Sequence, residues 1–386
     1  MAGDRPNWDG LLKWSLSHSD GTRPPRQFSE EDRKWFMEAM EAQTVDVVKR
    51  MKEITLVMNT PQQVLESQGV TTDDIEDMLD ELQEHVESID MANDLHSIGG
   101  LVPLLSYLKN SHAGIRAKAA DVVTTIVQNN PRSQQLVMEA NSFEPLMLNF
   151  SSDPDITVRT KALGAISSLI RHNKLGVSAF RLASGYTALK DALTSDSVRF
   201  QRKALNLIQY LLQEDKADCA VVSELGFPRI MMHLASSENA DVRESALRSL
   251  LELIKGGGVT AIGGASVEES ERFKQILQDQ IDRISSMAPE ELGAAKEERQ
   301  LVDMLWKACY KEPSSLQGKG LVVLAGEDEP PPDVASTMFE PPLRAFAANR
   351  SASKKKDDPL LLGYASPAEP QSENTTGEEN DSSKRS

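Results

Sequence analysis

The sequence predicts an all-α fold, an armadillo-like right-handed superhelix (α-solenoid) with helical caps and disordered termini. The first observation is one apolar pattern that occurs four times, at spacings of 43, 42 and 42 residues. Each copy has apolar residues at i, i+4, i+8 and i+11, which lie on one face of a helix. A helical period of roughly 40 to 47 residues is typical of armadillo and HEAT arrays, whose units must stack to bury their apolar faces. The copies share an alanine: Ala119, Ala162, Ala204 and Ala246.

The second observation is that each copy contains three helices, which favours armadillo units over two-helix HEAT units. A short helix follows Gly100, Ser142, Gly185 or Gly226, and a turn rich in Ser, Asn or Asp then supplies caps for a long helix. A further short helix, such as 135–140 or 219–225, leads into the next unit. We therefore expect four armadillo repeats over 99–255, divided as 99–141, 142–184, 185–225 and 226–255.

Two segments precede the repeats. Residues 1–28 form a flexible arm that is too short to fold alone and carries an apolar cluster. Residues 29–98 form a helical N-terminal cap, because an array needs capping units to stay soluble. One helical stretch starts at Ser29 and stops near Pro61, and a second opens at Thr71. The second stretch places one apolar stripe on Ile75, Met78, Leu79, Leu82, Val86, Ile89 and Met91.

Three segments follow the repeats. The glycines at 256–258 and 263–264 indicate a flexible linker over 256–265. Helical periodicity resumes over 266–311, which we expect to be a C-terminal helical cap. From 312 to 386 the chain is rich in Pro, Ser, Glu and Lys. Such a composition buries too little apolar area to offset the entropy of ordering, so this tail is expected to be disordered.

Composition restricts the function. Asp and Glu outnumber Lys and Arg by 59 to 42, a net charge of −17, which argues against nucleic-acid binding and favours a protein partner. The chain shows no apolar run near 18 residues and no basic start followed by an apolar stretch, so we expect neither a membrane span nor a signal peptide. Two cysteines, Cys219 and Cys309, suit a reducing compartment. A cytoplasmic location is therefore expected.

No motif indicates chemistry. The six histidines show no metal-ligand spacing, no nucleophile motif is present, and Gly256–Gly264 lack the ending and the preceding strand of a phosphate loop. We expect no enzyme activity, no metal, no cofactor and no small-molecule substrate.

The candidate binding site lies on a free flank of the long helices. Lys118, Lys161 and Lys203 recur at one phase, about 130° from the centre of the apolar stripe at 100° per residue. In armadillo arrays that face is concave, and a row of cations there would steer an acidic partner. The alternative is a solvated flank that binds nothing. The same face is expected to present Asp121, Ser168, Asn206, Tyr210 and Arg248.

Two further residue sets have competing interpretations. Arg116, Arg159 and Arg243 begin the long helices, with Gln201 as the exception, and we expect them to bond neighbouring carbonyls rather than a partner. The arm cluster either docks on the array's own cap or is a tethered ligand for a hydrophobic groove of another protein. That cluster comprises Leu11, Leu12, Trp14 and Leu16.

Three segments carry a family resemblance: 11–15 (LLKWS), 89–94 (IDMAND) and, most specifically, 158–169 (VRTKALGAISSL). Together they resemble the armadillo-type nucleotide exchange factors of seventy-kilodalton heat-shock chaperones. The resemblance covers about residues 1–255, and the long polar tail is similar to a plant-like form. It implies that the concave face grips the ATPase domain of the chaperone and holds its nucleotide cleft open. It also implies that the arm competes for the chaperone's peptide groove.

Two rival functions fit less well. Peptide-carrying adaptors of nuclear import resemble one another in a Trp and an Asn four residues apart on successive long helices. The matching pairs here are Asp121/Thr125, Gly164/Ser168, Asn206/Tyr210 and Arg248/Glu252, so that ladder is absent. A ligase with an armadillo tail would need a catalytic or zinc-binding module in the first hundred residues, and none is visible there.

Overall fold

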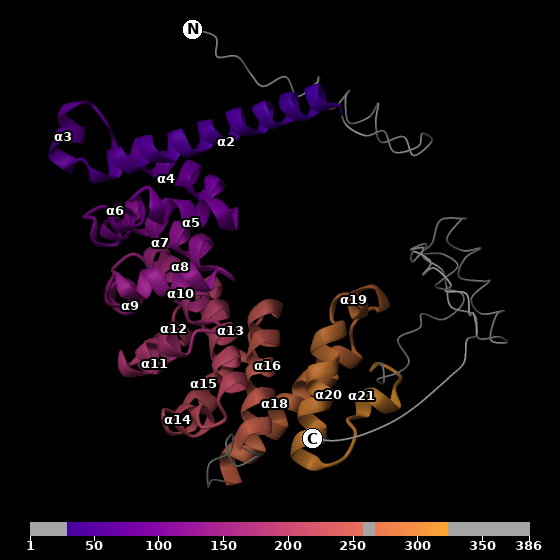
Figure 1. The fold of residues 1–386 in the computed structure, drawn as a ribbon. Coiled ribbons are helices and arrows are strands. Elements are labelled where there is room, and N and C mark those ends of the chain that lie inside the picture. Colours follow the sequence, from indigo (N-terminus) through magenta and orange to yellow (C-terminus); the bar gives the residue numbers. More distant parts are fainter. Residues whose placement is uncertain (1–28, 258–266, 323–386) are drawn as a thin grey trace, which may run out of the picture. The chain divides into compact units, whose positions relative to one another are not determined.

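The computed structural model describes residues 29–257 and 267–322, and in these ranges it contains helices and no strand (Figure 1). The cap helices at the start are α2 (Glu30–Asn59), α3 (Gln62–Ser67), α4 (Thr72–His85) and α5 (Ile89–Ser97). The repeat helices are α6 (Leu101–Ser106), η1 (Tyr107–Lys109), α7 (Ala113–Val127), α8 (Pro131–Glu139), α9 (Phe143–Ser152), α10 (Ile156–Ile170), α11 (Lys174–Leu182), α12 (Gly185–Leu193), α13 (Val198–Glu214), α14 (Asp218–Glu224), α15 (Phe227–Leu234) and α16 (Ala240–Gly257). The remaining helices are α18 (Val267–Ser285), α19 (Pro289–Ala294), α20 (Lys296–Tyr310) and α21 (Ser315–Gly318).

The long helices α7, α10, α13 and α16 lie side by side as one layer, and short helices cover one side of it (Figure 1). Side-chain caps begin α10, α13 and α16 as the turn composition predicts, whereas His112 at the start of α7 makes no such hydrogen bond. Asp155 accepts from the backbone N–H groups of Thr157 and Val158, at 2.7 and 3.0 Å, and Asn239 accepts from that of Val242 at 3.1 Å. The all-α solenoid predicted from the sequence is confirmed.

The layer extends beyond the four repeats at both ends. Helix α4 packs on α7, and α20 packs on α16, in the way the repeat helices pack on one another. The caps therefore behave as atypical repeats. One residue of the first cap's predicted stripe is wrong: Ile89 is 55% exposed, because a new helix, α5, begins there and turns it outward, whereas Met91 packs against the core.

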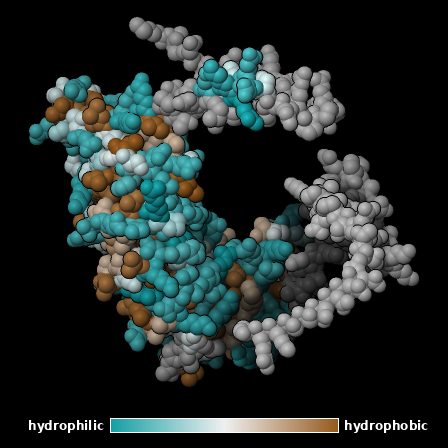
Figure 2. Space-filling model, viewed as in Figure 1, coloured by the Kyte–Doolittle hydropathy of each residue, from teal (hydrophilic) through white to brown (hydrophobic). Residues whose placement is uncertain are grey.

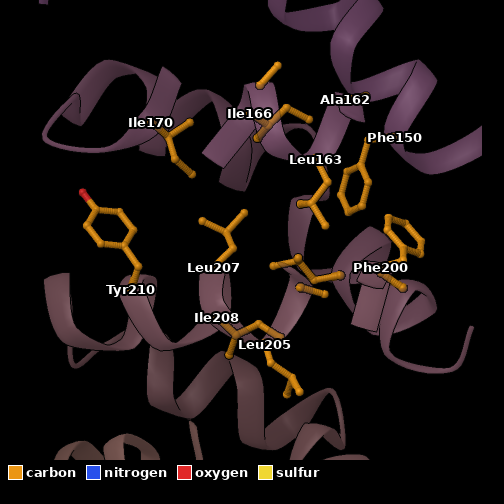
Figure 3. Close-up of a cluster of buried hydrophobic side chains, with 14 of the residues drawn as sticks. Phe150, Ala162, Leu163, Ile166, Ile170, Phe200, Leu205, Leu207, Ile208 and Tyr210 are labelled. Carbon is orange, nitrogen blue, oxygen red and sulfur yellow. The ribbon is translucent and has the colours of Figure 1, made fainter. Parts of the chain in front are cut away.

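The core runs between the layers without interruption. All four repeated alanines are fully buried, so each marks a close approach of neighbouring helices. Figure 3 shows the packing of α9 and α10 against α13, where the ring of Phe150 from α9 meets that of Phe200 edge to face with centroids 5.9 Å apart. Leu163 lies beside them (Figure 3).

The arginines that begin the long helices are structural, as expected. Arg116 donates to the carbonyls of Asn110 and Ser111 at 2.8 and 2.9 Å, and Arg159 donates to that of Phe150 at 3.0 Å. Gln201, the exception in the pattern, donates to the carbonyl of Leu193 at 3.2 Å. An amide thus serves the same purpose, because one N–H donor is enough to satisfy the preceding turn.

Two expected boundaries are corrected. Helix α16 continues through Gly257, so Gly256 belongs to a helix and not to a linker. Helix α21 lies within the tail expected to be disordered from 312, because Ser314 donates to Asp303 at 2.7 Å and Leu316 is fully buried. The expectations for 1–28, for 258–265 and for 323–386 fall outside the described residues.

A buried charge network joins the last repeat to the C-terminal helices. Arg243 of α16 makes two hydrogen bonds to Glu298 of α20, at 2.6 and 3.1 Å, and Arg283 of α18 binds the same carboxylate. Burial on its own would raise the pKa of Glu298. The hydrogen bonds from Arg243 and Arg283, with their charges, outweigh burial and lower the pKa.

Removal of this carboxylate is expected to loosen the C-terminal helices. Glu298→Gln should lower the free energy of unfolding by about 3 kcal/mol, because the buried Arg243 loses its counter-charge. Since the native pKa is lowered, the contribution of Glu298 is complete above the unfolded pKa and is lost as the pH falls through the native one. Thermal unfolding between about pH 7 and about pH 3 measures the effect.

The difference between wild type and variant should shrink on acidification, and a difference that stays constant with pH contradicts the assignment. Glu290→Gln, on the exposed surface of α19, is the matched control and should leave stability unchanged.

Candidate functional site

The predicted site residues lie on the free flank of the long helices, which we call the long-helix face and define by Lys118, Lys161 and Lys203. Two of these lysines pair with the preceding long helix. Lys118 of α7 forms an ion pair with Asp80 of α4, and Lys161 of α10 forms one with Asp121 of α7. We call this series of pairs the inter-repeat ladder. Lys118 and Lys161 therefore do not present unpaired cations, because each ammonium group already pairs with a carboxylate of the neighbouring helix.

The inter-repeat ladder stops at the third lysine. The position that holds Asp121 in α7 holds Gly164 in α10, so Lys203 of α13 meets no carboxylate there. Its ammonium nitrogen lies 2.7 Å from the point that a Cβ on Gly164 would occupy. Within the described residues Lys203 makes no hydrogen bond and no ion pair, and it is the unpaired member of the series.

The environment of Lys203 disfavours its charge. Burial, and then the neighbouring cations Arg199, Lys161 and Arg202, lower the pKa of Lys203, while Asp121 opposes the shift. A native pKa below the unfolded value means that the protonated lysine costs stability at neutral pH. The site thus holds a cation that an incoming carboxylate would relieve.

The other predicted residues differ in accessibility. Asn206 is exposed on α13, and Ser168 is half-buried, with its backbone carbonyl accepting from Gln134 at 3.0 Å. Arg248 is half-buried and binds Glu244 of its own helix and Glu297 of α20. Of these three residues, Asn206 is the one that is exposed.

Tyr210 does not lie open on this face, which corrects the prediction. Only 7% of it is exposed, and its hydroxyl accepts from the backbone N–H of His172 at 2.8 Å. The guanidinium carbon of Arg171 lies 4.6 Å from its ring centroid. The turn after α10 covers the ring, which lies at the edge of the core cluster near Ile170 (Figure 3).

Polar and apolar surface separate between the two sides of the repeats. Figure 2 shows a largely hydrophilic surface over α13 and α16, whereas hydrophobic residues form separate spots along short helices such as α6, α9 and α11. The exposed apolar residues on those three helices are Val102, Leu148, Leu175 and Leu182. The long-helix face is therefore suited to a polar, charge-guided contact rather than to an apolar one.

The described residues offer binding groups rather than reactive ones. Among 29–257 and 267–322, no three His, Cys, Asp or Glu side chains gather to hold a metal ion. In the same ranges no helix is both long enough and apolar enough to cross a membrane. Leu11, Leu12, Trp14 and Leu16 of the arm lie outside the described residues.

Two candidate binding features of this face are not singled out by the sequence pattern. Arg199 precedes Lys203 by one helical turn, is exposed and makes no ion pair within the part of the chain that the structure describes. Gly164 lies on the same flank as the lysines in the helical pattern. Periodicity alone does not show that the inter-repeat ladder lacks an acid at this position. An alignment of the repeats contains the signal, since Gly164 occupies the position of Asp121.

Comparison with known proteins identifies relatives. Residues 8–95 match the family model described as nucleotide exchange factor Fes1, and residues 91–224 match that of the SIL1/FES1/HPBP1 C-terminal domain. The chain is 29% identical over 257 residues to Hsp70-binding protein 1 of Mus musculus, covering 64% of this chain and 72% of that one. It is 30% identical over 201 residues to Hsp70 nucleotide exchange factor FES1 of Kluyveromyces lactis, covering 50% of this chain and 67% of the other.

Solved structures support the fold. A designed armadillo repeat protein, YIII(Dq)4CqI, superposes with a TM-score of 0.50 at 16% identity, over 67% of this chain and 99% of the other. At this identity the likeness concerns the fold alone.

The paired and the unpaired lysine should respond in opposite ways to removal of the charge. Lys161→Met is expected to lower the free energy of unfolding by about 1–2 kcal/mol, because Asp121 loses its partner in a mostly buried pair. Lys203→Met is expected to raise the melting temperature by about 2–4 °C, because it removes an unpaired half-buried charge. Thermal unfolding at neutral pH measures both, and equal effects of the two substitutions contradict the assignment.

Proposed function

Because this chain belongs to the family of Fes1 and SIL1/FES1/HPBP1 proteins, we propose that it is a nucleotide exchange factor of an Hsp70 chaperone. One observation carries the proposal: the family matches run from residue 8 to residue 224, through α4, α7, α10 and α13, which present the long-helix face. We propose that this face contacts the ATPase domain of the chaperone and promotes release of ADP.

Binding alone accounts for the activity. A factor that prefers the open, nucleotide-poor state of the ATPase domain shifts the population toward it without any reaction of its own. A shift from about 1:99 to 99:1 needs a preference of about 10⁴-fold. Linkage requires that bound nucleotide lowers the affinity of the factor for the chaperone by the same ratio. The stacked helices supply the rigidity for such a preference, because their buried core fixes the positions of the helices that present the face.

The proposed activity takes place in the cytoplasm and involves no cofactor. Both cysteines are free, with Cys219 buried and Cys309 half-buried, which supports a reducing compartment. Burial raises the pKa of the Cys309 thiol to about 11, so it is a poor nucleophile at neutral pH. These properties support a binding protein rather than an enzyme.

A charge placed on the long-helix face is expected to reduce exchange. Asn206→Glu should slow factor-stimulated release of labelled ADP from Hsp70 by about tenfold, which corresponds to about 1.4 kcal/mol, through repulsion of an acidic partner. Thr187→Glu is the matched control, since Thr187 is exposed on the short helix α12 of the same repeat.

The control should retain full stimulation. Wild-type activity in Asn206→Glu would exclude this part of the face from the contact. The absence of stimulation by the unaltered protein would refute the proposed function itself.

The arm is proposed to act on the chaperone's client and not on its nucleotide. Deletion of residues 1–22 should leave ADP release unchanged and slow the discharge of a bound peptide, because Leu11, Leu12, Trp14 and Leu16 would otherwise compete for the peptide groove. Stopped-flow release of labelled ADP and of labelled peptide measures the two steps separately.

A full-length variant with serine at these four positions controls for arm length and should match the deletion. Unchanged peptide discharge in both variants argues that the arm takes no part.

A further inference from the structure

The break in the inter-repeat ladder leaves a cation site between the second and third repeats. Lys118 and Lys161 each find an acid one long helix earlier, at Asp80 and Asp121. Lys203 finds Gly164 at the same place and extends across it, next to the Lys161–Asp121 pair. The ammonium group is thus half-buried and unpaired, in a position where its two counterparts are neutralised.

A second unpaired cation stands beside it. Arg199 lies one helical turn before Lys203 on α13, so both side chains share one flank of that helix. Arg199 is exposed and makes no ion pair with the described residues, whereas the nearby Arg202 is paired with Asp241. The two free cations therefore concentrate positive charge at one point of a chain whose net charge is −17.

We propose that Arg199 and Lys203, above Gly164, form a carboxylate-binding site, and that its occupant is an acidic side chain of the chaperone's ATPase domain. This inference rests on the proposed function and names the anchor of that contact. Gly164 contributes by having no side chain, so that the end of Lys203 lies where an aspartate stands in the repeat before it.

The chemistry of the site favours a single carboxylate. Arg199 supplies a planar fork and Lys203 a point charge, so one Asp or Glu can accept from both. The carboxylate of Asp121 and the exposed Asp241 limit the positive field on either side. An extended polyanion would meet these acids, and the overall negative charge would repel it.

The half-buried position of Lys203 also explains why the site lowers the stability of the protein when no partner is bound. Desolvation penalises the protonated Lys203, and the neighbouring Asp121, which is already paired with Lys161, offsets that penalty only in part. A partner carboxylate would stabilise the charge on binding. Stability given up at a binding site for the sake of the partner is common in proteins.

An internal competitor tests the site directly. Gly164→Asp places a carboxylate at the position that Asp121 occupies in α7, within reach of Lys203. A Cβ at Gly164 meets the movable end of Lys203 and Thr124 at 3.6 Å, so the substitution fits. Gly164→Asn, of the same shape without the charge, is the matched control.

Thermal unfolding of the full chain and its affinity for Hsp70 without nucleotide, measured by titration calorimetry, are the two readouts. Gly164→Asp is expected to raise the melting temperature by about 2–4 °C over Gly164→Asn and to weaken binding at least tenfold, because the internal carboxylate occupies the site. Lys203→Met with Arg199→Met should weaken binding to a similar degree.

The outcomes separate the two proposals. If wild-type protein binds Hsp70 and hastens ADP release while Gly164→Asp binds as tightly as Gly164→Asn, the carboxylate site is refuted and the exchange function stands. If wild-type protein neither binds nor stimulates release, the proposed function fails. A gain in stability without a loss of affinity would make the introduced carboxylate a purely structural partner of Lys203 and would also overturn the site.

Discussion

The close approach of successive long helices is the constraint on which the rest of the structure depends. A helix of this array has too few apolar neighbours within its own repeat, so it must bury its face against the next one. Fully buried alanines, such as Ala162 and Ala204, allow that approach, and rings such as Phe150 and Phe200 fill the space beside them. Burial of this continuous core offsets the loss of chain entropy and fixes the register between helices.

The fixed register gives polar side chains on the free flank their partners. Lys118, Lys161 and Lys203 each lie beside the same position of the preceding long helix. The residue at that position therefore decides whether the lysine is paired. With aspartate, as at Asp80 and Asp121, the lysine is part of the scaffold. With Gly164 the lysine has no acid at that position. The same backbone geometry therefore leaves the lysine paired in two repeats and unpaired in the third.

A factor that works through differential affinity must resist deformation when its partner opens. The ends of an array are its weakest part, because a terminal helix has one neighbour instead of two. Here α4 and α20 continue the layer of long helices, and the buried Arg243–Glu298–Arg283 network ties the last repeat to α18 and α20. Charge that is buried and paired in this way is sensitive to loss of one member, which makes the junction specific.

The sequence by itself determined the fold class, the phase of the lysines and the structural purpose of Arg116, Arg159 and Arg243, because helical periodicity and turn chemistry are local properties. Only the tertiary structure decided which lysines are free, because the pairs join residues 38 and 40 positions apart on neighbouring helices. It also decided that Tyr210 is covered by the turn at His172 and that Leu316 is buried in an otherwise polar segment. Each of these contacts depends on how neighbouring helices stack, which the sequence of a single helix does not specify.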